Sequence, residues 1–202
     1  VKLMQHILFF AGYRLKIFSL SAGKVAHCTV FEPDENGLAE FSDYIAENAS
    51  KPVRLLVDVI DEDFHLDSVP HVFGKDRKEL HQRLLNKYLR GAEHRYITIQ
   101  GRQKGERRDD QVLLSGISNS GLLKPWLDVL NEQKVALAGI HSLPLLAESA
   151  LKDWSMSRGA HLLISQQVPT SVRHSLYFNG QLKMSRLAQA LGDEHESSNQ
   201  TA

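Results

Sequence analysis

The chain has 202 residues, enough for one large domain or two small lobes, and 42% of them are hydrophobic, enough for a real core. Its 24 basic and 24 acidic residues cancel, so no overall charge attracts nucleic acid or an anionic membrane, and we expect no nucleic-acid partner. Cys28 is the only cysteine, which excludes an internal disulfide and a multi-cysteine zinc site and fits a reducing compartment.

Both ends of the sequence suggest a piece of a longer protein. The chain starts at Val1 rather than Met, and residues 189–202 are predicted to be a disordered polar tail. No run reaches the roughly 18 apolar residues that span a bilayer, and the start lacks the features of a signal peptide. We therefore expect membrane attachment only through segments outside this sequence, such as a helix after residue 202.

The first fifty residues predict two extended runs and a helix. Residues 7–20 alternate about Gly12, and residues 24–31 form a second extended run, which together predict a hairpin. Apolar residues then recur at helical spacing from residue 38 to about residue 48.

A buried strand and an amphipathic helix follow. Residues 53–60 are typical of a buried strand, which leads into an acidic bend at residues 61–64. Pro70 keeps residues 65–74 out of a helix. Residues 75–90 form a helix with a charged face and an apolar face.

The clearest part of the chain is residues 111–151, where strand, turn, helix, strand and helix follow one another without a gap. Residues 118–121 supply turn and capping chemistry between the first strand and its helix. The charged segment 101–110 before this part is predicted to be a solvated hairpin loop. Three short strands end the chain, the last two joined by the hairpin signal Asn179-Gly180. The pattern predicts an α/β fold.

Four acidic residues near the end of the strand at 53–60 are a candidate metal site. Asp58, Asp61 and Asp63, with Glu62 between them, offer the carboxylates that a hard cation such as magnesium prefers, which would suit nuclease-type chemistry. Only Asp58 belongs to the strand, and no distant carboxylate is identifiable. A solvated acidic turn is therefore the preferred interpretation.

The turn after residue 115 comes close to a nucleophile elbow. Gly116, Ser118 and a downstream His141 resemble parts of that pattern, but Ser120 replaces its second glycine. Serine and asparagine before a helix are also what N-capping requires. We therefore interpret Ser118 as part of a helix cap.

The charged loop is a candidate contact surface. Arg102, Lys104, Arg107 and Arg108 could meet phosphates or a protein partner. The loop has no interleaved aromatic residues, and two aspartates follow it, so a solvated hairpin is the preferred interpretation.

The order of elements resembles the actin-like ATPase superfamily, and within it the bacterial pilus and secretion assembly proteins of PilM, MshI and GspL type. The resemblance depends on VLLSGI at 112–117, VALAGIHSLPLL at 135–146, and the final hairpin with its Ser185-Arg186. It implies a ribonuclease-H-like mixed sheet flanked by helices. The organisation that it implies is a first lobe at 1–153 with an inserted subdomain at about 65–140, the start of a second lobe at 154–188, and a disordered tail at 189–202.

ATP-binding members of that superfamily use two phosphate loops, each a turn with glycine and aspartate. Here the first corresponding turn, residues 9–14, has one glycine and no acid, and the second, residues 165–171, has a proline but neither glycine nor acid. We therefore carry over no catalytic, cofactor-binding or metal residue, and expect no cofactor.

The leading prediction is a non-catalytic scaffold that works through contacts with other proteins of a membrane-associated pilus or type II secretion assembly. The resemblance implies a place at the cytoplasmic face of the inner membrane, and a homo-oligomer stays open. Two alternatives remain: a nucleotide-binding actin-like ATPase, and a metal-dependent ribonuclease-H-like enzyme that uses Asp58.

Overall fold

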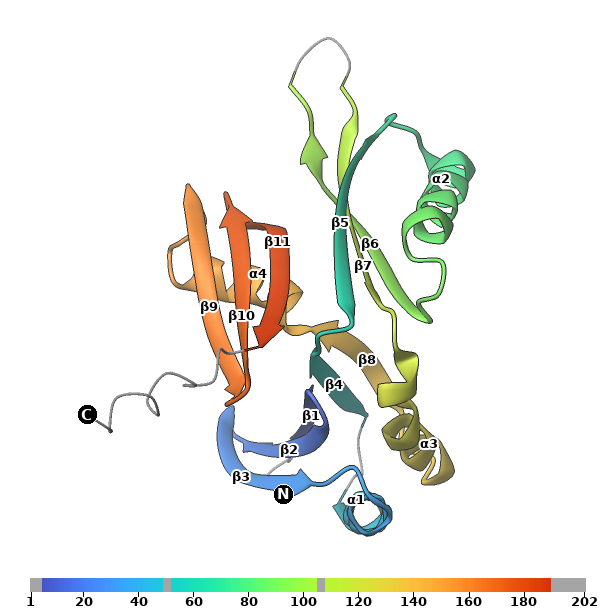
Figure 1. Cartoon of the computed structure of the whole chain (residues 1–202), viewed down its shortest axis with the longest axis vertical. Helices are drawn as coiled ribbons and strands as arrows, with labels where there is room; N and C mark the ends of the chain where they lie inside the picture. The colour runs from blue at the N-terminus through green and yellow to red at the C-terminus, as the bar shows by residue number, and fades with distance from the viewer. Residues whose placement is uncertain (1–4, 49–51, 105–107, 190–202) are drawn as a thin grey trace, which may run out of the picture.

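The computed structural model describes residues 5–48, 52–104 and 108–189, which form three β-sheets with helices packed against them (Figure 1). The first sheet has the strand order β3-β2-β1-β4-β8, the second β5-β7-β6 and the third β11-β10-β9. The two smaller sheets stand side by side above the first sheet in Figure 1. The predicted α/β fold is confirmed.

The first sheet is mixed. Its strands are β1 (Gln5–Ala11), β2 (Arg14–Ser21), β3 (Lys24–Phe31), β4 (Val53–Asp58) and β8 (Leu137–Ser142). β1, β2 and β3 form an antiparallel meander, whereas β4 runs parallel to both β1 and β8. The sequence predicted a hairpin of two extended runs for this opening segment, and that prediction is wrong because the segment forms three strands. Gly12, with φ of 75°, turns the chain between β1 and β2, a conformation that glycine adopts without strain.

Two helices cover this sheet, α1 (Glu35–Asn48) and α3 (Lys124–Glu132). They meet through Phe41 and Trp126, whose rings lie 5.5 Å apart at a near-perpendicular angle. Both side chains belong to the largest core cluster, which also contains Leu8, Leu15, Ile17, Leu55 and Val57 from the sheet. The main core thus lies between the first sheet and this helix pair.

The second sheet is antiparallel and consists of β5 (Glu62–Val69), β7 (Asp110–Ile117) and β6 (His94–Arg102). Helix α2 (Gly74–Tyr88) packs against it through Leu80, Leu84 and Leu85. The sequence predicted no strand at β5. Because β5 lies at an edge of its sheet, its residues are largely polar and give a weak strand pattern.

The third sheet contains β9 (Ala160–Val168), β10 (Ser171–Phe178) and β11 (Gln181–Gln189). Asn179 and Gly180 have φ of 51° and 72°, the left-handed pair of a tight hairpin turn, as predicted. Helix α4 (Leu143–Asp153) contributes Leu151 to a small core with Tyr177 and Leu182, and this core also includes Leu113 of β7. The second and third sheets therefore share buried side chains.

The order predicted for residues 111–151 is confirmed by β7, the short 3-10 helix Ser120–Leu122, α3, β8 and α4. None of the described helices is long and apolar enough to cross a lipid bilayer. The tail predicted from residue 189 onward lies outside the described residues except for Gln189. The lobe boundaries stay predictions.

Candidate functional site

The candidate site is built on a buried arginine. Strand β10 points Arg173, Ser175 and Tyr177 to one side, because alternate residues of a strand share a face, and all three are buried. The Tyr177 hydroxyl donates to the carbonyl of Pro144 at 2.8 Å, and burial raises its pKa to about 12. Arg173 is 1% exposed and must find its hydrogen-bond acceptors within the protein.

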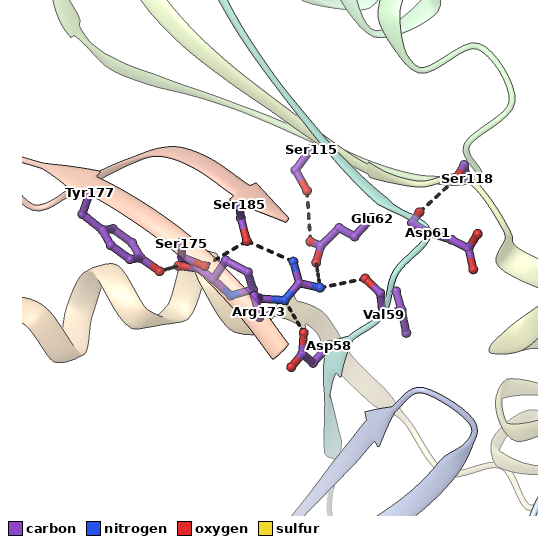
Figure 2. A network of polar contacts seen from close by, with 11 residues as sticks. Asp58, Val59, Asp61, Glu62, Ser115, Ser118, Arg173, Ser175, Tyr177 and Ser185 are labelled. Carbon is purple, nitrogen blue, oxygen red and sulfur yellow. Dashed lines mark hydrogen bonds and ion pairs between the residues drawn. The ribbon is translucent and has the colours of Figure 1, made fainter. Parts of the chain in front are cut away.

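The Arg173 guanidinium finds these acceptors on two different sheets (Figure 2). Its Nε forms a short ion pair with Oδ1 of Asp58, at the end of β4, and its Nη2 donates to the carbonyl of Val59 at 2.7 Å. Its Nη1 donates to Ser185 Oγ on β11 at 3.0 Å, and that hydroxyl lies 2.9 Å from Ser175 Oγ. Arg173 thus joins the first sheet to the third.

Glu62 adds the second sheet to this network. It is the first residue of β5, its Oε2 lies 4.0 Å from Arg173 Nη2, and its Oε1 accepts a hydrogen bond from Ser115 of β7 at 3.3 Å. Burial raises the pKa of Glu62 to about 7, although the nearby Ser142 hydroxyl and the Arg173 charge lower it in part. The three sheets therefore meet at one arginine and two carboxylates.

The structure separates the predicted metal candidates. Asp58 is paired with Arg173, Asp61 offers its backbone carbonyl to Ser118, and Asp63 is exposed on β5. Within the described residues there is no group of three or more histidine, cysteine, aspartate or glutamate side chains placed to hold a metal ion. The counter-charge beside Asp58 is a guanidinium supplied by the chain itself.

The structure also corrects the helix cap predicted at Ser118. The Ser118 hydroxyl and backbone N–H both donate to the Asp61 carbonyl, at 2.9 and 2.8 Å, and Asn119 before the 3-10 helix makes no side-chain cap bond. No hydrogen bond between Ser118 and His141 is present in the described part of the chain. A side chain at Gly116 would lie 3.0 Å from a Leu89 methyl group, so this glycine serves packing.

The predicted basic surface is partly engaged within the protein. Arg102 Nε lies 3.4 Å from an oxygen of Asp110, and its Nη2 contacts the ring of His71, which is 2.8 Å from the same carboxylate. Burial opposes ionisation of Asp110, but His71 and Arg102 outweigh it and lower its pKa. Lys104 and Arg108 are exposed, and Arg107 lies outside the described residues.

A cleft of about 700 Å³ opens beside the arginine network. Its walls come from β6 and β7 on one side and from β8 and α4 on the other; they include Glu93, His94, Arg95, Tyr96, Ser115, Ile117, Ile140, His141, Ser142, Leu145, Leu146 and Ser149. Val57 and Glu62 also line it, so Glu62 belongs to both the network and the cleft. The candidate functional site is therefore the cleft together with the buried charges beside it.

Sequence reasoning missed Arg173 and grouped Glu62 with a solvated turn. One signal was available: the inward positions of β10 read Arg, Ser and Tyr, so that the buried face of this strand is polar. The partners of Arg173 could not be read from that pattern, because Asp58 lies 115 residues earlier in the chain.

Replacing Arg173 tests the network. Arg173→Met should lower the free energy of unfolding by about 3–5 kcal/mol, because Asp58 is left buried without a counter-charge. The double variant Asp58→Leu/Arg173→Met should recover most of that loss, since both charges are removed together. Urea unfolding at pH 7 measures each variant.

The matched control for this prediction is Arg14→Met. Arg14 pairs with Glu32, and both side chains are about half exposed, so the expected cost is about 0–1 kcal/mol. A double variant no more stable than Arg173→Met alone would contradict the charge-compensation argument.

Glu62→Gln tests the raised pKa. A folded-state pKa of about 7, against a usual 4.5, favours the folded protein by roughly 3 kcal/mol below pH 4.5, and this stabilisation is lost as pH rises through 7. The amide does not ionise, so the variant should gain stability relative to the native protein from pH 5 to pH 8. Urea titrations at both pH values measure the difference, and a difference that does not change with pH would refute the assignment.

Comparison with known proteins gives matches by structure. No protein-family model matches the chain, and no curated protein matches it by sequence. A chain of the PilM–PilN type IV pilus biogenesis complex superimposes with a TM-score of 0.66 at 12% identity, over 96% of this chain and 63% of that one. The present chain thus spans less than two thirds of that protein.

Two further structures align with lower scores. The cytoplasmic domain of EpsL, an inner membrane component of the type II secretion system of Vibrio cholerae, has a TM-score of 0.49 and 14% identity over 93% of this chain and 71% of that one. A protein with an actin-like ATPase fold from Bacteroides thetaiotaomicron has a TM-score of 0.47 and 16% identity over 94% and 72%. At these identities the likeness concerns the fold. The fold resembles that of a chain of the PilM–PilN complex, as the sequence predicted for the PilM type.

Proposed function

We propose that this chain is a non-catalytic scaffold domain that binds a protein partner in a membrane-associated assembly of the pilus or type II secretion kind. The fold shared with a chain of the PilM–PilN complex supports the class of assembly. The ion pair between Arg173 and Asp58 is the observation that carries the non-catalytic part of the proposal.

This ion pair argues against nucleotide chemistry at the end of β4. A carboxylate that holds magnesium or orients water must have an oxygen that is both free and accessible to that ligand. Oδ1 of Asp58 is bound to the guanidinium, and Oδ2, which has no hydrogen-bond partner among the described residues, is buried in a residue that is only 1% exposed. Because this guanidinium belongs to the chain, it does not dissociate as a bound ion would. We therefore assign Asp58 a structural role.

The two turns that correspond to phosphate loops support the same conclusion. The β1–β2 turn consists of Gly12 and Tyr13, and the β9–β10 turn of Pro169 and Thr170. They lie close together, because a Cβ on Gly12 would be 3.9 Å from a Val168 methyl group. Such short turns offer few free backbone N–H groups to a phosphate, and proline offers none.

The cleft is the surface that best fits a partner. β6 is an edge strand of the second sheet, so one row of its backbone groups lacks a partner strand among the described residues. Tyr96 on this strand is 53% exposed and Leu146 on the opposite wall is 49% exposed. An extended segment could pair with β6 and place apolar side chains against α4. We propose this surface in preference to Lys104 and the rest of the basic loop.

The proposed setting is the cytoplasmic face of the inner membrane, with attachment through segments outside this sequence and with the partner drawn from the same assembly. The proposal does not require more than one copy of the chain in such an assembly.

Titration with ATP and magnesium tests the non-catalytic part. We expect no change in melting temperature up to millimolar ATP, because Arg173 occupies the acidic site and the turns lack phosphate ligands. Thermal unfolding and calorimetric titration measure this. A saturable stabilisation by ATP–magnesium would support the nucleotide-binding alternative instead.

Site-specific photocrosslinking in the native cell tests the partner surface. A benzoylphenylalanine at Tyr96 should crosslink to a protein of the membrane fraction, whereas the same group at Tyr13, an exposed residue in the β1–β2 turn, should not. A third position, Lys104, examines the basic loop. Crosslinks from position 104 with none from 96 would move the contact surface to the loop.

A further inference from the structure

The charges of the chain are unevenly distributed although they cancel overall. Helix α1 contains neither lysine nor arginine, and all of its acidic side chains are exposed: Glu35, Glu40, Asp43 and Glu47. Helix α2 and the residues just after it expose a row of cations: Lys75, Lys78, Arg83, Lys87 and Arg90. The two helices lie toward opposite ends of the long axis in Figure 1. The protein therefore has an acidic end and a basic end.

The cations of α2 lie on its outer face. The opposite face of the helix, which carries its leucines, packs against the second sheet. Glu79 is an acidic residue within the row and lies 3.6 Å from Lys75 and 3.7 Å from Arg83. Asp76 in the first turn is the other acidic residue of the helix. These two carboxylates do not compensate the whole row, so the outer face of α2 is positively charged.

An exposed aromatic ring stands at the start of this face. Phe73 immediately precedes α2 and is 70% exposed. The His71 ring packs edge to face against it with centroids 4.3 Å apart, and the Arg77 guanidinium lies over it, 5.3 Å from its centroid. Arg77 donates through Nε to the Val72 carbonyl at 2.9 Å, and none of the described carboxylates pairs with it. An aromatic ring and an uncompensated cation are thus held together at the surface.

Tyr13 offers a contrast elsewhere in the structure. It is also exposed, and the Arg14 guanidinium lies over its ring at 5.1 Å from the centroid. Here the cation is compensated, because Arg14 pairs with Glu32 at 2.9 Å. Exposure of an aromatic ring beneath an arginine therefore does not by itself create a positive surface, and Tyr13 is a matched control for Phe73.

The combination at α2 suits the surface of an anionic lipid bilayer. Clusters of lysine and arginine are attracted to anionic headgroups, and an aromatic ring can enter the interfacial layer. The acidic end of a second copy also has the opposite charge. However, the large apolar side chains of α1 are not exposed, so that end offers no apolar contact to Phe73. A lipid surface satisfies both features of α2.

We propose that the outer face of α2, together with Phe73, contacts an anionic lipid bilayer and orients the chain with α1 away from the membrane. This inference rests on the proposed function only for the membrane setting, since the surface is separate from the cleft. Each basic residue near an anionic membrane contributes about fivefold to binding. Such a contact orients a protein that is already held at the membrane, where the effective lipid concentration is high.

The test is NMR of the uniformly labelled chain with lipid nanodiscs that carry a gadolinium-chelating headgroup. The discs contain phosphatidylcholine and phosphatidylglycerol, and discs of phosphatidylcholine alone are the charge control. We expect relaxation enhancement at the amides of Phe73, Lys78 and Arg83, and at least about fivefold less at those of Glu40 and Glu47. Raising the salt concentration to about 0.5 M should abolish the enhancement, because salt screens surface charges.

Charge variants test the face of α2. Lys78→Gln/Arg83→Gln should weaken binding by about 25-fold, since two contributions of about fivefold are lost. Both side chains are exposed, so the variant is expected to fold. The matched control Glu40→Gln/Glu47→Gln removes two charges from the acidic end and should change binding by less than about twofold, because those charges lie beyond the screening length.

Aromatic variants test the ring. Phe73→Ser should weaken binding by at least about threefold, because the interfacial contact of the ring is lost. Tyr13→Ser should leave binding unchanged.

Several results would overturn the inference. They are the absence of enhancement with anionic discs, equal enhancement with neutral discs, equal enhancement at α1 and α2, and binding that survives Lys78→Gln/Arg83→Gln or is unaffected by Phe73→Ser. Sedimentation without lipid adds a further check. Self-association at low salt that Lys78→Gln/Arg83→Gln abolishes would assign the face to a second copy and overturn the lipid assignment.

The result can be separated from the proposed function. Lipid contact at α2 without crosslinks at Tyr96 would support the inference and contradict the proposed partner surface. Crosslinks at Tyr96 without lipid contact would overturn the inference and leave the scaffold function standing.

Discussion

The buried Arg173 guanidinium is the interaction on which the arrangement of the three sheets depends. It holds Asp58 of the first sheet, Ser185 of the third, and lies near Glu62 of the second. A buried ion pair is not by itself strongly stabilising, because desolvation offsets much of the attraction. Its value is in specificity: any packing of the sheets that separates these groups leaves a charge buried without a partner. The network therefore favours one relative placement of the sheets over others that would bury similar apolar area.

How much the sequence predicts depends on the range of the interactions involved. Residues 111–151 were predicted correctly because their helices and strands have long apolar patterns that local periodicity reveals. Strand β5 was missed because an edge strand keeps polar residues on much of its surface. The Arg173 network could not be predicted, since Asp58 and Arg173 come together only when separate sheets pack. The acidic residues stand together in the sequence, whereas the counter-charge of Asp58 lies 115 residues away.

Glu62 links the stability of the Arg173 network to the chemistry of the cleft. The same burial that raises its pKa also makes its ionised form costly unless a cation is near. Arg173 supplies part of this compensation at 4.0 Å, but Asp58 competes for the same guanidinium at closer range. A carboxyl poised in this way changes its charge near neutral pH. Any group that binds in the cleft and prefers one charge state must therefore shift the protonation of Glu62, and protonation must shift binding to the same extent.

Under the proposed function, the position of the arginine also accounts for how the sheets stay together without a bound nucleotide. A ligand and its metal stabilise the packing of two sheets only while they are bound. A side chain of the protein itself stabilises that packing at all times. The guanidinium of Arg173 provides the positive charge at the end of β4 within the chain itself. The first and third sheets are thereby joined next to the cleft, whose walls include residues of β6 and α4. A cleft that is already formed suits a scaffold, because binding a partner segment then carries little cost of reorganising the protein.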